Sequence, residues 1–406
     1  MGVRRSRHGA VTGPGARPAE DGGATDPAGS GVEATARPQT STRDRDDLHR
    51  RLVTWLGARV TDPEVSELVV PESNGMSSET LLFECTWRDT DAPSPAARIT
   101  QACAARLVPD PDAVPVFPVY DLERQFRVLR LVAERTRVPV PRTLWLELDP
   151  EAIGSPFFVM ERVEGVVPPD IMPYPFGSWL SEAPRADQDR LQDSSVRVLA
   201  ELHGAPVSAH DIAFLELDRP GDTALRRHLA EQRSYYEWVV ADGARSPLIE
   251  RTFTWLEDHW PASEGAPVIS WGDARIGNMM FRDFEPVAVL DWEMAAVGPR
   301  EIDIGWMVYL HRFLDDIAIQ AGLPGMPHFM RLDDVAAAYA RHSGHTPTDL
   351  DFYTMYAALR HAIVMSRVAR RQVLFGEITM PEDPDDMIMH RPTLEQMLAG
   401  TYWDKL

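Results

Sequence analysis

Residues 267–293 read PVISWGDARIGNMMFRDFEPVAVLDWE. Two short apolar runs flank a polar turn in this stretch, a pattern that is typical of a β-hairpin. If the turn centres on Phe284–Glu285, Asn278 and Asp291 lie opposite each other at the open end of the hairpin. The sequence therefore predicts a carboxylate and an amide side by side at the end of two paired strands.

The polar side chains of this hairpin favour chemistry on a metal-bound phosphate. Carboxylate and amide oxygens are hard ligands of the type that Mg²⁺ prefers when phosphates and waters complete its octahedron. Asp273 precedes Asn278 by five residues and lies outside the strand, so it is free to act as a base beside such a site. Taken singly, each of these residues is also typical of a loop in which it only caps a turn. The prediction therefore depends on Asp273, Asn278 and Asp291 occurring together.

The chain on the N-terminal side of residue 162 is predicted to form a small sheet with helices. Apolar runs predict strands, whereas apolar residues at a helical spacing predict helices. The expected strands cover residues 67–70, 81–87, 102–108, 143–146 and 156–160. One expected helix starts near Asp46, and another covers residues 122–135.

The chain beyond Glu161 is predicted to be mainly helical, which makes the protein α+β. The expected helices lie at 191–202, 224–240, 247–259, 331–342 and 349–374. Residues 46–162 and 163–406 are therefore the two expected lobes. Residues 1–45 hold almost no large apolar side chain, so we expect a disordered tail that cannot offset the entropy lost on ordering.

The charge balance of the chain narrows the classes of partner. The 41 basic and 62 acidic residues give a formal net charge of -21. Such a field repels phosphate backbones, which argues against nucleic acids and anionic membranes as partners. No apolar run approaches the ~18 to 20 residues needed to cross a bilayer. Only two cysteines occur, Cys85 and Cys103, which fits a reducing compartment.

The choice of basic residue carries information of its own. Lys405 is the only lysine among the 41 basic residues, so any cation in the interior must be an arginine. The bias toward arginine, alanine, proline and aspartate is typical of a GC-rich bacterial genome, and we expect a cytoplasmic protein. No pattern in the sequence indicates the oligomeric state.

A resemblance to a known family rests on three motifs. They are Gly272–Phe281, Val289–Glu293 and Gly298–Asp303, and they resemble the signature of the aminoglycoside phosphotransferase family, which is related to choline kinases and protein kinases. The similarity continues upstream over Pro156–Gly165 and covers roughly residues 50–310. It is closest to the kinase-like domains that are fused to some acyl-CoA dehydrogenases.

The resemblance implies a bilobal, protein-kinase-like fold and a reaction. A small N-terminal lobe of antiparallel sheet plus one helix would face a larger, mainly helical C-terminal lobe, with ATP in the cleft. Asp273 would accept the proton from the substrate hydroxyl or orient it, and Asn278 and Asp291 would hold Mg²⁺ on the phosphates. Arg275 stands where protein kinases carry a lysine that contacts the transferred group, so it would stabilise charge in the transition state.

The resemblance also implies how ATP would be held. Met160, Glu161 and Val163 would belong to the hinge whose backbone groups meet the adenine. A turn that ends with Ser77 and Ser78 would cover the phosphates through backbone N–H groups and the two hydroxyls. Because hinge recognition runs through the backbone, the sequence does not distinguish ATP from GTP.

The cation that binds the phosphates departs from the family pattern. The family pairs a strand lysine with a helix glutamate, and the interior of this chain has no lysine. Arg106 is the expected replacement, because a guanidinium binds phosphate oxygens bidentately, and Arg98 is the competing candidate. Gln125 stands in the place of the glutamate, so the ion pair is either an Arg106–Gln125 hydrogen bond or absent. Trp271 stands where the family usually has a histidine.

Two acids and the acceptor pocket leave alternatives open. Asp303 is expected to support the catalytic loop, and Glu293 either touches a second metal ion or caps a turn. An acidic pocket would favour a cationic amino sugar, whereas arginines such as Arg360 and Arg367 would favour an acyl-CoA or another anion. The similarity to the dehydrogenase-fused branch favours a hydroxyacyl-type substrate.

The leading hypothesis is an ATP-dependent kinase that phosphorylates a small-molecule alcohol. The alternative is a nucleotide-binding pseudokinase that acts as a regulatory or interaction module. Gln125, Trp271 and the missing lysine support the alternative. The presence of Asp273, Asn278 and Asp291 supports an active enzyme.

Overall fold

The computed structural model describes most of the chain. The described residues are 43–71, 78–92, 94, 96–110, 114–241 and 243–403. Most of the predicted tail over residues 1–45 lies outside them, as do Ser77 and Lys405.

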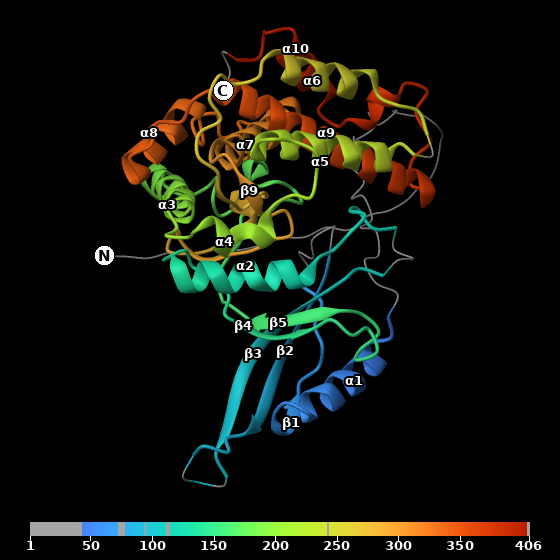
Figure 1. Ribbon diagram of the computed structural model, residues 1–406, viewed down its shortest axis with the longest axis vertical. Coiled ribbons are helices and arrows are strands. Elements are labelled where there is room, and N and C mark those ends of the chain that lie inside the picture. The colour runs from blue at the N-terminus through green and yellow to red at the C-terminus, as the bar shows by residue number, and fades with distance from the viewer. Residues whose placement is uncertain are drawn as a thin grey trace, which may run out of the picture. The chain divides into compact units, whose positions relative to one another are not determined.

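A five-stranded sheet, coloured blue to green in Figure 1, contains the strands of the N-terminal part. Its order is β1-β2-β3-β5-β4, and all neighbours pair antiparallel. The strands are β1 Thr61–Val65, β2 Glu79–Arg88, β3 Arg98–Leu107, β4 Thr143–Glu147 and β5 Phe157–Glu161. The strand expected at 67–70 is wrong, because Val69 makes only an isolated bridge with Leu82. The edge strand β1 lies earlier, and its mostly exposed residues form no apolar run.

Helix α1, Arg45–Gly57, packs on one face of this sheet. Asp44 caps its N-terminus by accepting hydrogen bonds from the N–H groups of Asp46 and Asp47. The buried apolar residues of α1 share a core with side chains of β2, β3 and β5. The amphipathic helix expected near Asp46 is therefore confirmed.

Alternation along β3 separates the side chains of the core from the side chain that faces the site. Cys103, Ala105 and Leu107 lie in the core beneath α1. Because successive side chains of a strand point to opposite faces, Arg106 lies on the other face. There it pairs in register with Phe158 of β5, which belongs to the core shared with the helical part.

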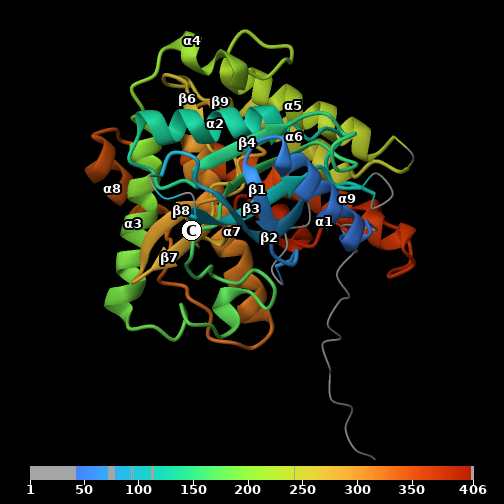
Figure 2. The same cartoon turned by 90° about the horizontal axis from the view of Figure 1, so that it is seen from below.

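Helix α2 spans Leu122–Arg135, the range that the sequence predicts. Asp121 caps it by accepting a hydrogen bond from the N–H of Arg124 at 2.8 Å. The helix packs against β4 and β5, and Figure 2 shows it beside β4. Its buried face includes Gln125.

The rest of the described chain is mainly helical, and the predicted α+β class is confirmed. The helices are α3 Arg185–His203, α4 Ala209–Ile212, α5 Ala224–Val239, α6 Pro247–Asp258, α7 Glu301–Gln320, α8 Leu332–Ser343, α9 Leu350–Leu374 and α10 Arg391–Leu398. Two short antiparallel pairs join them, β6 Val268–Ser270 with β9 Ala296–Gly298, and β7 Met279–Arg282 with β8 Glu285–Val289.

Helix α7 is the longest helix that the sequence patterns did not predict. Fourteen of its 20 residues are buried, polar ones such as Asp303, His311 and Arg312 among them, so its apolar residues form no helical stripe. It packs along α9, where Gly305 permits close contact: a Cβ at this position would lie 2.7 Å from the carbonyl carbon of Tyr353. None of the helices within the described ranges has the length and apolar character required to span a membrane.

Candidate active site

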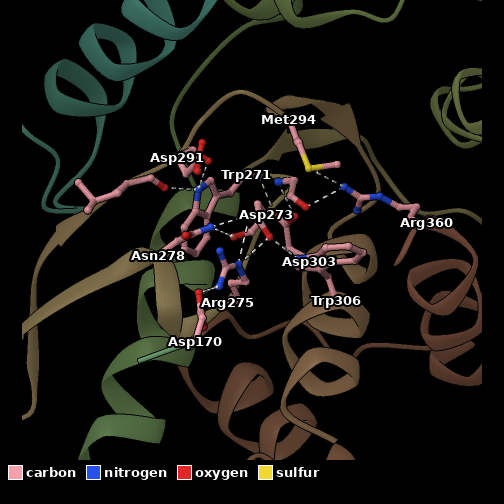
Figure 3. Close-up of polar contacts among 12 residues, drawn as sticks. Asp170, Trp271, Asp273, Arg275, Asn278, Asp291, Met294, Asp303, Trp306 and Arg360 are labelled. Carbon is pink, nitrogen blue, oxygen red and sulfur yellow. Dashed lines mark hydrogen bonds and ion pairs between the residues drawn. The ribbon is translucent and has the colours of Figure 1, made fainter. Parts of the chain in front are cut away.

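A tight loop follows β6 and carries the residues predicted to do chemistry (Figure 3). It runs from Trp271 through the single 3-10 turn Ile276–Asn278 into β7. At Gly272 the backbone φ is +87°, and a Cβ there would collide with the carbonyl oxygen of Met294. Glycine meets both requirements, since it has no Cβ and adopts positive φ without strain.

Asp303 of α7 anchors the backbone of this loop. Its Oδ1 accepts hydrogen bonds from the Ser270 hydroxyl at 2.8 Å and the Gly272 N–H at 2.9 Å. Its Oδ2 accepts one from the Trp271 N–H at 2.7 Å and lies 3.0 Å from His203 Nε2. Burial by itself raises the pKa of a carboxyl group, but hydrogen bonding with His203 and the loop holds the pKa of Asp303 below its ordinary value. The charged carboxylate therefore stabilises the loop.

Asp273 has both carboxylate oxygens in hydrogen bonds (Figure 3). Oδ1 accepts one from the indole N–H of Trp306 at 2.7 Å. Oδ2 accepts one from Asn278 Nδ2 at 2.6 Å and another from Arg275 Nε at 3.2 Å. The side chain keeps 16% of its surface exposed, so the oriented carboxylate can still meet a small molecule.

Arg275 lies between two carboxylates. Besides Asp273, it forms an ion pair with Asp170, which precedes α3 in the chain. Gly277 leaves room for this approach, because a Cβ at that position would collide with Asp170 and Arg275. The cation predicted at Arg275 is thus held at the side of the expected base.

The predicted hairpin is present as β7 and β8, but its register is shifted. The turn residues are Asp283 and Phe284, which both have positive φ, as a type I′ hairpin turn requires. The turn lies one residue earlier than predicted, and the pairing contains an irregularity. As a result Asn278 lies opposite Leu290, whose N–H donates to the Asn278 carbonyl at 2.8 Å. The prediction that Asn278 faces Asp291 directly is therefore wrong by one position.

Asp291 follows the end of the hairpin in a left-handed conformation, with φ of 58°. Its Oδ1 lies 3.0 Å from Arg106 Nη2, and both side chains are about nine-tenths buried, with 14% and 13% exposed. Glu293 Oε2 is 4.0 Å from the same nitrogen. Arg106 therefore brings a positive charge to the acids at the end of the hairpin.

The structure also distinguishes the alternatives for this cation. Arg98 lies at the far end of β3 and pairs with Glu64 at 3.0 Å, so it does not reach Asp291. Gln125 is buried in α2, and no hydrogen bond joins its amide oxygen, the atom that could accept from a guanidinium, to Arg106 in the described part of the chain. The sequence left two outcomes open for this pair, a hydrogen bond or no contact. The structure shows the second, because Arg106 and Gln125 form no hydrogen bond.

Trp271 joins the loop to the hairpin. Its side chain is fully buried, and its indole N–H donates to the carbonyl of Leu290 at 2.9 Å and to that of Asp291 at 3.2 Å. The indole thus orients the two segments that carry the predicted base and metal ligand.

The residues expected to hold a nucleotide lie on the sheet. Met160 and Glu161 end β5 and are partly buried, and Val163 lies two residues beyond the end of the strand. Ser78 precedes β2, and its buried hydroxyl has no partner in the described part of the chain. Ser77 lies outside the described residues.

Two residues of the site were missed by the sequence analysis. Trp306 lies three residues after Asp303, a spacing that puts both on one face of α7. That signal becomes readable only once 301–320 is known to be a helix. Asp170 gives no signal, because its contact with Arg275 joins segments 105 residues apart.

Sequence comparison finds one family and several long relatives. The family model described as "Phosphotransferase enzyme family" matches residues 115–349. The chain is 27% identical over 268 residues to IBR3 of Arabidopsis thaliana, named a probable acyl-CoA dehydrogenase, with 62% of this chain and 31% of the relative covered. It is 26% identical over 265 residues to acyl-CoA dehydrogenase family member 10 of Mus musculus, with coverages of 62% and 23%. The chain thus spans less than a third of the length of these two relatives.

Solved structures share the fold. A Ralstonia eutropha protein provisionally assigned as an aminoglycoside phosphotransferase matches with a TM-score of 0.59 and 23% identity, over 88% of this chain and 98% of the neighbour. The GDP complex of a variant aminoglycoside 2'-phosphotransferase-IIIa matches with a TM-score of 0.52 and 14% identity, over 89% and 100%. These neighbours confirm the predicted bilobal kinase-like fold.

Proposed function

The chain belongs to the phosphotransferase enzyme family. From this premise we propose that it is an ATP-dependent kinase that transfers the γ-phosphoryl group to the hydroxyl of a small molecule. The observation that carries the proposal is the convergence of Asp273, Asn278 and Asp291 at the junction of one loop and one hairpin, beside the buried cation Arg106.

Asp273 is the base of the proposed reaction. The acceptor oxygen attacks the γ-phosphorus, the bond between that phosphorus and the bridging β–γ oxygen breaks, and ADP leaves. The acceptor proton passes to the Asp273 carboxylate, whose hydrogen bonds with Trp306 and Asn278 hold it in one orientation. Arg275, next to this carboxylate, offers a positive charge to the group in transfer.

The donor set at the end of the hairpin fits Mg²⁺. Asp291 offers a carboxylate, and Asn278 offers its amide oxygen because its amide nitrogen is used by Asp273. These are hard oxygen ligands, and Mg²⁺ is usually bound by one or two such groups together with phosphates and water. A bound Mg²⁺ would neutralise phosphate charge.

The nucleotide contacts follow from the same proposal. Met160, Glu161 and Val163 supply hinge backbone groups to the adenine, and residues 46–162 form the nucleotide-binding lobe. Ser77 and Ser78 cover the phosphates. The remaining residues, 163–406, carry the catalytic loop and the acceptor site. The proposed location of the enzyme is the cytoplasm.

A hydroxyacyl compound is the proposed acceptor. The relatives named acyl-CoA dehydrogenases support this class over an amino sugar. The two arginines considered for the acceptor pocket both donate to backbone carbonyls. Arg367 donates to Pro115 at 2.8 Å and Arg360 donates to Gly272 at 2.9 Å. The proposed acceptor class therefore rests on the relatives and not on these two side chains. A panel that pairs hydroxyacyl-CoA esters with aminoglycosides tests the choice, and turnover of the aminoglycosides alone would contradict it.

Calorimetric titration of MgATP, with phosphate release followed in the same samples, tests the nucleotide site. We expect the wild type to bind MgATP and to hydrolyse it slowly. Asp291→Ala should lose metal-dependent binding, because it removes the carboxylate ligand. Asp334→Ala, the same change at an exposed position of α8, is the matched control and should bind normally.

Two results would contradict the proposed site. Unaltered nucleotide affinity in Asp291→Ala would remove this residue from the metal site. Binding of MgATP with no turnover of any alcohol would favour the pseudokinase.

The complementary variant Asp273→Ala should abolish turnover while it largely spares MgATP binding, and unchanged turnover would exclude Asp273 as the base.

A further inference from the structure

Trp306 contacts the proposed base from outside the catalytic loop. Its indole N–H donates to Asp273 Oδ1 at 2.7 Å, and only 4% of the residue is exposed. The other two donors to this carboxylate, Asn278 and Arg275, belong to the loop or to the turn that ends it. Trp306 is therefore the donor that ties the Asp273 side chain to helix α7.

Arg360 of α9 contacts both Trp306 and the backbone next to Asp273. Its Cζ lies 4.3 Å from the centroid of the Trp306 ring, a distance at which a cation and an aromatic face attract. Its Nη2 donates to the Gly272 carbonyl at 2.9 Å, one residue before the base. The same nitrogen lies 3.6 Å from the Met294 sulfur (Figure 3).

The polar environment of Arg360 is unusual for a buried cation. The residue is 3% exposed, and among the described residues no carboxylate lies within ion-pair distance of it. Its Nε also lacks a hydrogen-bond partner within that part of the chain. A buried cation without a carboxylate partner is costly, and the groups that offset this cost are the Gly272 carbonyl, the Met294 sulfur and the Trp306 ring.

We propose that Trp306 and Arg360 act as a pair of positioning residues that fix the Asp273 carboxylate for proton transfer. Trp306 sets the orientation of Oδ1, and Arg360 holds both the Trp306 ring and the backbone that carries Asp273. Neither side chain touches the substrate in this scheme. The inference rests on the proposed kinase function, because it assigns to these residues the orientation of its base.

Trp306→Phe tests the hydrogen bond, since it keeps a ring and removes the N–H donor. We expect the rate constant for MgATP hydrolysis to fall by about 10- to 100-fold, the size of effect that a misplaced reacting group produces. The affinity for MgATP, measured by calorimetry, should stay within about twofold of wild type, since Trp306 contacts none of the proposed nucleotide ligands.

Trp260→Phe is a matched control outside the site. The Trp260 indole also donates to a carboxylate, Glu264, at 2.8 Å, and the guanidinium of Arg226 also lies over its ring, at 3.5 Å. The control thus loses the same kind of hydrogen bond beside the same kind of cation. Its hydrolysis rate and MgATP affinity should match the wild type.

Arg360→Met and Arg360→Lys test the second member of the pair. The methionine variant should lower the hydrolysis rate without lowering MgATP affinity, and the lysine variant should restore part of the rate because it keeps a charge and a donor. Combining Arg360→Met with Trp306→Phe should lower the rate no further than the worse single variant, since residues that act as a unit are not additive.

Three results would overturn the inference. One is a wild-type hydrolysis rate in Trp306→Phe, and another is an equal loss of rate and MgATP affinity in Trp306→Phe and Arg360→Met, which indicates general disruption. The third is full additivity in the double variant. Each leaves the kinase proposal standing, whereas a wild type that neither binds nor hydrolyses MgATP would overturn both. Should Trp306→Phe fail to fold, the contrast between Arg360→Lys and Arg360→Met decides alone.

Discussion

Asp303 shows how much of the site depends on one buried carboxylate. It is fully buried and accepts hydrogen bonds from the backbone N–H groups of Trp271 and Gly272 and from the Ser270 hydroxyl. A charge in this position is stable only because these donors and His203 compensate for lost hydration. The residue contacts no reacting atom, yet it shapes the loop that presents Asp273.

Asp303→Asn should lower the free energy of unfolding by about 2 to 5 kcal/mol, because an amide cannot replace a carboxylate that accepts from several donors. The folded state holds the pKa of Asp303 below its ordinary value of 3.8. A depressed pKa contributes stability above the unfolded-state pKa, and this contribution is lost as the pH falls through the folded-state pKa.

The difference in stability between wild type and Asp303→Asn should therefore be constant above about pH 5 and shrink below the ordinary pKa of the group. Urea unfolding at a series of pH values measures it. A difference that grows on acidification would contradict the assigned sign.

Among the elements, the loop after β6 depends on the absence of a Cβ at Gly272. Gly272→Ala should destabilise the protein by at least about 3 kcal/mol and abolish MgATP hydrolysis, because the new Cβ meets the Met294 carbonyl in a strained backbone. Thermal unfolding and phosphate release measure the two effects.

Gly322→Ala separates the clash from the backbone strain. Gly322 also has a positive φ, +78°, but a Cβ there would meet nothing within 4 Å. Its replacement should cost about 1 to 2 kcal/mol and leave hydrolysis intact. Equal losses in the two variants would mean that the close approach at Gly272 does not matter.

Helix α7 contacts both the backbone of the catalytic loop and the proposed base, through two side chains that lie three residues apart. Asp303 binds the backbone, and Trp306, one turn later, binds the Asp273 side chain. The close contact of Gly305 with α9 sets the depth of this helix. Because α7 is buried around most of its circumference, with apolar and polar side chains mixed along it, the periodicity that revealed α2 and α9 did not reveal it.

At the level of the whole chain, the single lysine makes a chemical prediction. Lys405 and the N-terminal amine are the only amines, so acylation of amines should leave MgATP hydrolysis intact. Phenylglyoxal, which modifies arginines, should inactivate the enzyme, and MgATP should slow this loss by covering Arg106. Residual hydrolysis and peptide mapping of Arg106 check both points.

Inactivation by an amine reagent that MgATP prevents would contradict this prediction. Phenylglyoxal inactivation that MgATP does not slow, with Arg106 equally modified in both samples, would remove Arg106 from the phosphate site. Because the chain has 40 arginines, extensive modification would not report on Arg106, so the two samples should be compared at a low extent of reaction.

Local patterns were enough to identify the hairpin, its acidic residues and most helices. Spacing within one element follows from fixed geometry of 3.6 or 2 residues per repeat, so α2 and the β7–β8 pair could be located from the letters alone. The register of that pair could not, because a one-residue change in the turn moves Asn278 from Asp291 to Leu290.

Contacts between distant elements depended on the folded chain. Arg106 meets Asp291 across 185 residues, and Gln125 does not take part. Asp170 reaches the catalytic loop from a segment that carries no motif, and Trp306 reaches it from three residues beyond the Gly298–Asp303 motif. Such contacts arise from the packing of whole helices and strands against one another. Their relative positions are set by the combined energy of many weak side-chain contacts, and no short stretch of sequence determines that energy.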